Sequence, residues 1–281
     1  MRTLYVTDLD GTLLDNRSLA SDSSQLMLNR AVERGAMFTV ATARTPATVD
    51  TLMRGIDMRL PGVVITGCAY YDFRHRRLLD PRVMKESAAD RLVGEWRESG
   101  LSAFVYTINA EGILEVYHIG PLSDLERTFI SERDKTPVKR FYVPESGESV
   151  LPSRLDNVML FFGLQPTEPA HELYEKLKAE MSVAEIAPQF YHDIYGDAIG
   201  ELEIFPAGVS KASALEKLAS DLAADRLVVF GDNVNDIPMM RLADEAIAVA
   251  NAKEDVKAVA TAVIGPNTDD AVARFILNET L

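Results

Sequence analysis

Acidic residues follow two short apolar runs at opposite ends of the chain. Asp8 and Asp10 stand in the sequence Asp-Leu-Asp-Gly-Thr, and Asp232 and Asp236 stand in the sequence Gly-Asp-Asn-Val-Asn-Asp. In an open α/β sheet, ligands bind at the carboxyl ends of the strands. Several carboxylates share a site only when a cation or a reaction compensates their charge. The two clusters therefore predict a cation site or carboxylate chemistry.

Each cluster also has an ordinary structural interpretation. Asp10-Gly11 reads as a common turn after a strand, and Asp232 or Asn233 reads as a helix cap. Capping accounts for one side chain, but not for two carboxylates and an amide within so short a segment. Mg²⁺ prefers a few oxygen ligands together with waters and phosphate oxygens. One carboxylate from each cluster with a backbone carbonyl would meet that requirement.

Two further positions are candidates for binding an anion. Thr42 lies between an apolar run and the helix start Thr45-Pro46, where a hydroxyl and free backbone amides would suit a phosphate. Helix capping by Thr42 or Thr45 is the alternative. Lys211 lies just inside another helix start, where a lysine opposes the helix dipole unless an anion lies in front of it. A solvated surface lysine is the alternative there.

Apolar runs alternate with amphipathic segments at both ends of the chain, which is typical of a parallel sheet covered on both faces. The expected strands are Leu4–Thr7, Met37–Ala41, Val63–Thr66, Leu227–Phe230, Ala246–Val249 and Ala262–Ile264. Helices are expected between them, including one over residues 22–34 capped by Ser21 or Asp22 and one that starts at Ser210. These two groups of strands predict a doubly wound α/β fold.

The middle of the chain has a different pattern. Strand-like runs at Phe104–Ile108 and Ile113–Ile119 flank a hairpin turn at Asn109–Gly112. Helix and strand signals continue to a proline break at Phe205-Pro206, so we expect an inserted α+β domain of about 120 residues. The expected domains are a core made of residues 1–81 and 206–281 and an insert made of residues 82–205.

Composition limits the possible partners. The chain has 281 residues and a net charge of −14, which disfavours nucleic acid and anionic membranes as partners. Cys68 is the only cysteine, so no intrachain disulfide is possible. The apolar runs are too short to cross a bilayer, and Asp8 and Asp10 interrupt the stretch where a signal peptide would need apolar residues. We expect a cytoplasmic enzyme that is a monomer or a homodimer.

The motifs, taken in their order along the chain, resemble those of the haloacid dehalogenase (HAD) superfamily of phosphotransferases. The segments 202–211 and 246–252 are similar to its Cof-type hydrolases, and the insert resembles their α/β cap in size and position. The resemblance implies a Rossmann-like HAD core with an inserted α+β cap domain. It also implies a Mg²⁺-dependent phosphatase that acts on small phosphorylated metabolites, above all sugar phosphates.

The resemblance implies a role for each candidate residue. Asp8 would be the nucleophile that forms an aspartyl-phosphate, and Asp10 would be the general acid and base. Lys211 and Thr42 would bind the transferring phosphoryl group. Mg²⁺ would be held by Asp8, the Asp10 carbonyl, Asp232 and Asp236. Asn235 would support the phosphate or the metal, and Arg44 would either contact substrate or pair with an acid.

Three positions depart from the family pattern. Ala43 and Ala212 stand where glycine is common, and Gly67 stands where an asparagine is common, so this chain lacks the asparagine side chain at that position. Two other functions are open. A phosphosugar mutase would need a bisphosphorylated activator and release little phosphate. A regulator that binds a phosphometabolite without turnover would be little affected by loss of Asp8.

Overall fold

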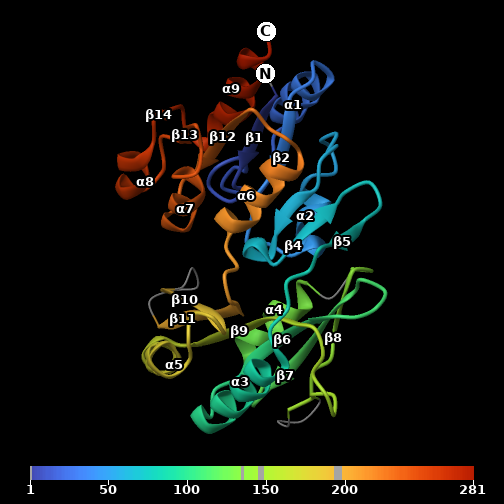
Figure 1. Cartoon of the computed structure of the whole chain (residues 1–281), viewed down its shortest axis with the longest axis vertical. Helices are drawn as coiled ribbons and strands as arrows, with labels where there is room; N and C mark the ends of the chain where they lie inside the picture. The colour runs from blue at the N-terminus through green and yellow to red at the C-terminus, as the bar shows by residue number, and fades with distance from the viewer. Residues whose placement is uncertain (1, 134–135, 145–148, 193–197) are drawn as a thin grey trace. The chain divides into compact units, whose positions relative to one another are not determined.

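The computed structural model describes residues 2–133, 136–144, 149–192 and 198–281. The chain divides into two units, which are described separately (Figure 1). The core unit comprises Met1–Asp80 and Ser210–Leu281, and the inserted unit comprises Pro81–Val209. The sequence-based boundary of the insert was residue 205, whereas the inserted unit ends at Val209.

The core unit is built on a five-stranded sheet in the order β14-β13-β12-β1-β2, in which all neighbouring strands are parallel. The strands are β1 (Thr3–Thr7), β2 (Met37–Val40), β12 (Arg226–Gly231), β13 (Glu245–Ala248) and β14 (Ala262–Val263). Thr7 in β1 lies opposite Phe230 in β12. Residues that follow these two strands therefore leave the sheet at the same edge.

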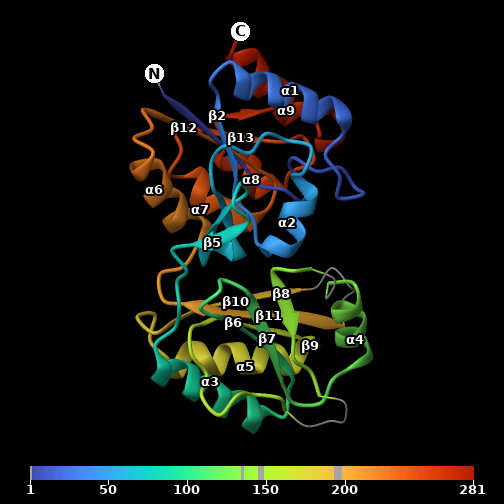
Figure 2. The ribbon, with the colours of Figure 1, turned by 90° about the vertical axis from the view of Figure 1, so that its right-hand side faces the viewer.

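Helices cover both faces of this sheet (Figure 2). They are α1 (Asp22–Glu33), α2 (Pro46–Leu52), α6 (Lys211–Asp221), α7 (Ile237–Met240), α8 (Glu254–Val259) and α9 (Ala271–Glu279), with short 3₁₀ turns at Ile65–Gly67, Val234–Asp236 and Asn267–Asp269. Helices α1 and α9 pack together on one side, and α6 and α7 pack together on the other. Ser21 and Ser210 cap α1 and α6 as expected, each accepting a backbone N–H bond on its side chain. The predicted α/β fold is confirmed.

The sixth expected strand forms, but it does not belong to the parallel sheet. The segment predicted as Val63–Thr66 forms β3 (Gly62–Val64), which belongs to an antiparallel sheet with β4 (Ala69–Asp72) and β5 (Arg77–Leu79). A single parallel bridge, Ala41 to Val63, joins β3 to the end of β2. The strand ends early because the next three residues all have positive φ and turn the chain back into β4.

The inserted unit contains a six-stranded sheet in the order β10-β11-β9-β6-β7-β8. Its elements are α3 (Glu86–Ser99), β6 (Ala103–Ile108), β7 (Leu114–Ile119), α4 (Asp124–Ser131), β8 (Lys139–Phe141), β9 (Val158–Pro166), α5 (Thr167–Glu180), β10 (Ile186–His192) and β11 (Ile199–Pro206). The expected hairpin is present as antiparallel β6 and β7, and Asn109 Oδ1 accepts bonds from the backbone N–H groups of Glu111 and Ile113 in its turn.

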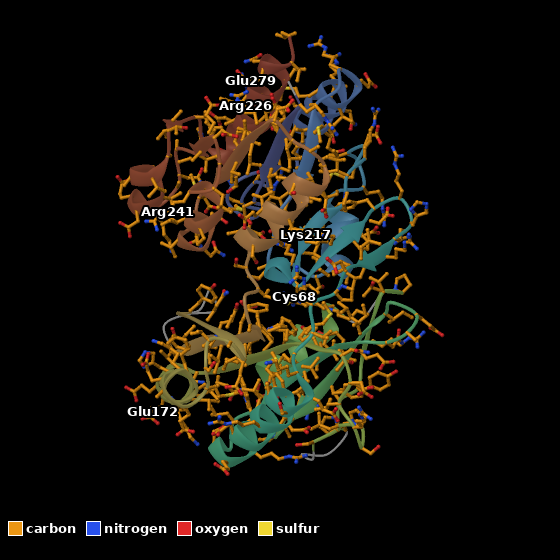
Figure 3. All side chains as sticks on the ribbon, in the orientation of Figure 1. Cys68, Glu172, Lys217, Arg226, Arg241 and Glu279 are labelled. Carbon is orange, nitrogen blue, oxygen red and sulfur yellow. The ribbon has the colours of Figure 1, made fainter. Side chains whose placement is uncertain are left out.

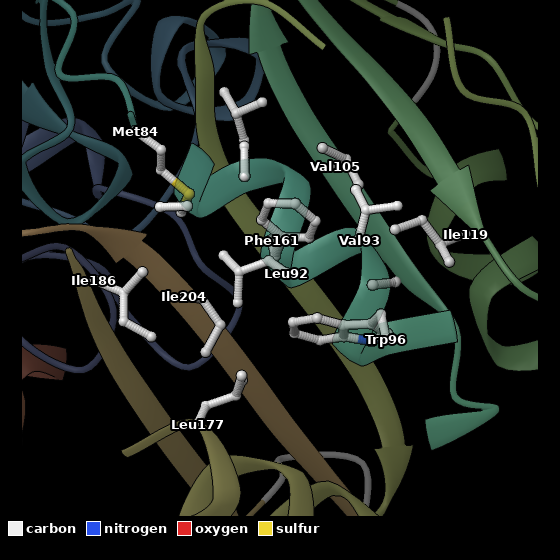
Figure 4. Packing of buried hydrophobic residues seen from close by; sticks show 14 of the residues in the cluster. Met84, Leu92, Val93, Trp96, Val105, Ile119, Phe161, Leu177, Ile186 and Ile204 are labelled. Atoms are coloured by element: carbon white, nitrogen blue, oxygen red, sulfur yellow. The ribbon is translucent and has the colours of Figure 1, made fainter. Parts of the chain in front are cut away.

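The inserted unit has its own hydrophobic core (Figure 4). Trp96 of α3 is fully buried and stacks on Phe161 of β9, with ring centroids 5.6 Å apart. The indole N–H of Trp96 donates to the carbonyl of Ser102 at 3.1 Å, so its polar atom is satisfied inside the core. Leu177 of α5 and Ile204 of β11 complete the packing on the same face of the sheet.

Among the described residues, no helix is both long enough and apolar enough to span a membrane.

Candidate active site

Three carboxylates meet at the edge of the sheet where β1 and β12 end. Oxygen atoms of Asp8, Asp232 and Asp236 all lie within 4.8 Å of one another. Asp8 is the first residue after β1, and Asp232 is the first residue after β12. Asp8 is 7% exposed and Asp236 is fully buried. The parallel register of the two strands thus brings together acids that are more than two hundred residues apart in sequence.

Lys211 completes this cluster from the first turn of α6. Its Nζ donates to Asp8 Oδ1 at 2.5 Å and to Asp236 Oδ1 at 2.8 Å. The lysine is 3% exposed, so it is not the solvated surface residue that was the alternative interpretation. Lys217 lies further along the same helix (Figure 3). In contrast to Lys211, its side chain is 41% exposed and pairs with Asp221.

The cluster holds more negative charge than Lys211 compensates. Burial raises the pKa of Asp8 to about 8, although Lys211 opposes this, and Asp236 adds to the increase. Burial likewise raises the pKa of Asp232 to about 6, with Thr12 opposing and Asp236 adding. Burial lowers the pKa of Lys211, but the charges of Asp8 and Asp236 outweigh it and hold that pKa above its usual range. A bound divalent cation would relieve this excess of negative charge, so the donor set fits Mg²⁺.

The turn after Asp10 fits closely around Asp232. Thr12 Oγ1 donates to Asp232 Oδ1 at 2.7 Å, and Asn251 Nδ2 donates to the carbonyl of Gly11 at 2.8 Å. Gly11 has φ +76°, and a Cβ at this position would lie 2.5 Å from Asp232 Oδ2. Only glycine allows this close approach. Asn251 was not predicted as a site residue, although it lies shortly after β13, a parallel strand that ends at the same edge of the sheet.

Asp10 lies outside the carboxylate cluster. Arg44 holds both of its carboxylate oxygens, through Nε and Nη2, each at 2.6 Å. Arg44 also donates to Ser18 Oγ at 3.2 Å. The hydrogen bond to Asp10 raises the pKa of Arg44. Of the two interpretations of Arg44, the structure therefore shows the ion pair with an acid.

Thr42 is buried, and its backbone N–H donates to the carbonyl of Val63 in β3 at 3.0 Å. Its Oγ1 accepts a bond from the backbone N–H of Arg44 at 3.1 Å, which leaves the hydroxyl hydrogen free to donate. The carbonyl of Thr42 accepts a bond from the N–H of Thr66 at 3.1 Å. The hydroxyl of Thr66 is buried without a hydrogen-bond partner. Thr42 is thus held in place by its backbone while its hydroxyl remains able to bind an oxygen.

Gly67 has a steric reason to differ from the family pattern. Its φ is +99°, and a Cβ there would lie 2.3 Å from the carbonyl oxygen of Ser210, directly before Lys211. An asparagine at this position would displace the start of α6 and with it the lysine.

Asn235 and Asp236 lie in the 3₁₀ turn that follows Asp232. The Oδ2 of Asp236 accepts bonds from the backbone N–H groups of Asp232 at 3.2 Å and Asn233 at 3.1 Å and so caps the turn, while its Oδ1 accepts from Lys211. Asn235 is half-buried, and its side chain forms no hydrogen bond with any part of the chain that the structure describes. Asn235 is the chain neighbour of Asp236, but no hydrogen bond among the described residues joins its side chain to the cluster.

Comparison with known proteins agrees with this geometry. A family model described as haloacid dehalogenase-like hydrolase matches residues 5–276, and the chain therefore belongs to this family. Pyridoxal phosphate phosphatase YbhA of Escherichia coli is 27% identical over 281 residues, covering 98% of this chain and 97% of that protein. The 5-amino-6-(5-phospho-D-ribitylamino)uracil phosphatase YwtE of Bacillus subtilis is 26% identical, covering 96% and 95%.

Solved structures show the same fold. A haloacid dehalogenase-like hydrolase from Bacteroides thetaiotaomicron superposes with a TM-score of 0.79 at 20% identity, covering 99% of this chain and all of that one. TM0651 from Thermotoga maritima superposes with a TM-score of 0.76 at 19% identity, covering 99% and 97%. The predicted family and fold are confirmed, and the chain is a phosphoric monoester hydrolase of this family.

Proposed function

We propose that the protein is a Mg²⁺-dependent phosphatase that hydrolyses small phosphorylated metabolites through a phosphoryl group carried on Asp8. The observation that supports this most strongly is the buried contact of Asp8 with Lys211 inside a cluster of acids. A nucleophilic carboxylate must be fixed and shielded from water, and the lysine supplies positive charge where a phosphate would enter.

Asp8, Asp232 and Asp236 would hold the metal, with the main-chain carbonyl of Asp10 as a further ligand. When bound, Mg²⁺ would neutralise the charge that otherwise makes a carboxylate and a phosphate repel each other. The raised pKa values of Asp8 and Asp232 support this assignment, because they reflect acids whose ionised form lacks a sufficient counter-charge. The hydroxyl of Thr12 donates to Asp232 and would hold that carboxylate in the orientation needed to bind a metal.

The chemistry divides into two displacements. In the first, an oxygen of Asp8 attacks phosphorus, the bond from phosphorus to the leaving oxygen breaks, and Asp10 gives that oxygen a proton. In the second, Asp10 takes a proton from water, the water oxygen attacks phosphorus, and Asp8 is released. Arg44 holds the Asp10 carboxylate in the resting protein, so we infer that Asp10 changes partner during the reaction.

Thr42 and Lys211 would bind the oxygens of the transferring phosphoryl group. Thr42 retains a free hydroxyl hydrogen, and Lys211 Nζ carries three donors, two of which already contact acids. Asn235 has an unengaged amide, which is consistent with support of the phosphate once substrate is bound. Fixed donors of this kind stabilise charge that develops in the transition state.

The proposed substrates are sugar phosphates and similar small phosphorylated metabolites. Pyridoxal phosphate is included because a relative that covers nearly the whole chain is named as a pyridoxal phosphate phosphatase. We propose that residues of the inserted unit select the leaving group and that the enzyme works in the cytoplasm. An acidic chain of net charge −14 fits neither nucleic acid nor an anionic membrane as its partner.

The turn at Gly11 gives a direct prediction for the metal site. We expect Gly11→Ala to displace Asp232 and to lower the free energy of unfolding by about 1–2 kcal/mol. The Mg²⁺ concentration that gives half-maximal phosphate release should rise by about tenfold or more. Gly100→Ala is the matched control, because Gly100 has φ +71° but has no neighbouring atom within 4 Å of a new Cβ. Equal Mg²⁺ dependence in the two variants would contradict the role of this turn.

The proposed function is tested by phosphate release from a panel of sugar phosphates, nucleotides, flavin mononucleotide and pyridoxal phosphate. We expect release with Mg²⁺, loss of release with a chelator, and recovery when Mg²⁺ is restored. The ranking of the panel would identify the substrate class. Release that survives complete chelation would contradict the metal assignment. Phosphate transfer that requires a bisphosphorylated activator would favour a mutase, and binding without turnover would favour a regulator.

A further inference from the structure

A cavity lies in the core unit and is lined by residues other than those of the carboxylate cluster. Its volume is about 340 Å³, and it is lined by the end of α2, the segment that follows it and the turn between β4 and β5. A volume of this size accommodates a small organic molecule. None of its lining residues belongs to the set assigned above to the metal or the phosphoryl group.

The floor of this cavity is apolar. Met53, Ile56 and Met58 line it and are 1%, 6% and 5% exposed, and Phe73 presents a half-buried ring. Phe73 packs edge-on against Tyr71, with ring centroids 5.2 Å apart. The two methionines and the aromatic ring form an adaptable surface suited to an aromatic or aliphatic group.

The acids of the cavity are already paired. Asp50 accepts hydrogen bonds from the hydroxyl of Tyr71 at 3.0 Å and from the guanidinium of Arg76 at 2.6 Å. Asp57 accepts a hydrogen bond from the guanidinium of Arg59 at 2.7 Å. Neither carboxylate therefore contributes an uncompensated negative charge to the cavity.

Two arginines at the cavity have no such partner. The guanidinium groups of Arg54 and Arg74 line the cavity and are exposed, and neither forms an ion pair or hydrogen bond within the described ranges. The nearby Asp72 is engaged by His75 and by the backbone N–H of Arg74. The lining thus carries excess positive charge in a chain whose net charge is −14.

We propose that this cavity is a second ligand site, which binds a small organic anion with an aromatic or aliphatic body and a phosphate or carboxylate group. The apolar floor would take the body, and Arg54 and Arg74 would take the anionic group, because guanidinium forms paired hydrogen bonds with both kinds of group. A polyanion such as nucleic acid fits poorly, because the chain as a whole carries a net charge of −14. The proposal is independent of the proposed catalytic function.

The test is a titration of the full-length protein, labelled with ¹³C at its methionine methyl groups, with phenylphosphonate. This probe has an aromatic ring and an anionic group, and its carbon–phosphorus bond is not a phosphate ester. We expect saturable shifts of the Met53 and Met58 methyl signals. The double variant Arg54→Gln/Arg74→Gln is expected to weaken this binding about tenfold or more while phosphatase activity is retained.

Matched controls make each outcome decisive. Arg30→Gln/Arg34→Gln removes the same charge from the exposed end of α1 and is expected to leave the shifts unchanged. Inorganic phosphate is expected to bind here at least about tenfold more weakly than phenylphosphonate, because it lacks the apolar body. The proposal would be overturned if the methyl signals of Met53 and Met58 did not shift, or if both double variants lost phenylphosphonate binding equally. It would also be overturned if inorganic phosphate bound as tightly as phenylphosphonate. The thermal midpoint of each variant checks folding without reference to activity.

Discussion

Asp8→Asn is expected to lower phosphate release by about 10⁴-fold or more, because it removes the oxygen nucleophile while keeping the shape of the side chain. Asp8 is buried and contacts Lys211 at 2.5 Å, so no other carboxylate of the cluster is placed to take over its position directly after β1. The measurement is phosphate release at saturating substrate and Mg²⁺, together with a thermal midpoint to verify folding.

Asp22→Asn is the matched control for this experiment. Asp22 lies in the exposed first turn of α1, so the same chemical change there should leave activity within about twofold. An Asp8→Asn variant that folds and retains activity within tenfold of wild type would contradict the nucleophile assignment. Loss of activity with loss of folding would instead be resolved by Asp8→Glu, which keeps the charge but moves the oxygen.

Lys211→Met is expected to lower both stability and activity. It leaves Asp8 and Asp236 buried without their cation, and breaking a buried ion pair in this way costs about 3–5 kcal/mol. Removal of a fixed charge at the phosphoryl group should also lower phosphate release by about 10²–10³-fold. Urea unfolding of metal-free protein measures the first effect, and added Mg²⁺ should restore part of the lost stability.

The destabilisation by Lys211→Met should depend on pH in a defined direction. The pKa of Asp8 is already raised to about 8 with Lys211 in place, and removal of the lysine raises it further. A carboxyl group with a raised pKa in the folded state stabilises it at low pH and loses that contribution as pH rises through the folded-state pKa. The difference in the free energy of unfolding between Lys211→Met and the wild type should therefore be smaller at pH 5 than at pH 8.

Lys217→Met provides the control for both measurements. Lys217 lies on the same helix, is 41% exposed and forms a surface pair with Asp221, so its loss should cost about 0.5 kcal/mol or less at either pH. If Lys211→Met behaved like Lys217→Met, the lysine would not be balancing buried acids.

The parallel sheet could be predicted from the sequence because its strands are buried on both faces. Leu4 and Val6 of β1 and Val228 and Val229 of β12 are fully buried, and runs of this kind are apolar at nearly every position. The third strand was misassigned because its end depends on positive φ at Ile65 and Thr66, a conformation that branched residues rarely adopt. No local pattern indicates that turn.

Helix α4 in the inserted unit was not predicted for a related reason. It has only eight residues, Asp124–Ser131, and its capping box of Ser123 and Glu126 is the main local signal for its start. Its apolar stripe spans only about two turns, whereas α3 and α5 have 14 residues each. Tertiary packing of Phe129 against Phe104 and Phe162 helps to hold it in place.

The carboxylate site was predictable where it depends on strand ends and not where it depends on side-chain partners. Residues that follow neighbouring parallel strands meet at one edge, so the approach of Asp8 to Asp232 follows from topology. The pairing of Asp10 with Arg44 depends on side-chain conformation, and the sequence left that choice open. The support of Gly11 by Asn251 depends on a loop from another strand.

The most direct test of the central claim is to locate the covalently bound phosphoryl group. The enzyme, mixed with its best substrate and Mg²⁺, is quenched in acid within one turnover, treated with hydroxylamine to trap an acyl-phosphate, and mapped by peptide mass spectrometry. We predict a hydroxamate at Asp8 in the wild type that is absent from Asp8→Asn. A phosphoryl group on another residue, with turnover retained in Asp8→Asn, would contradict the account.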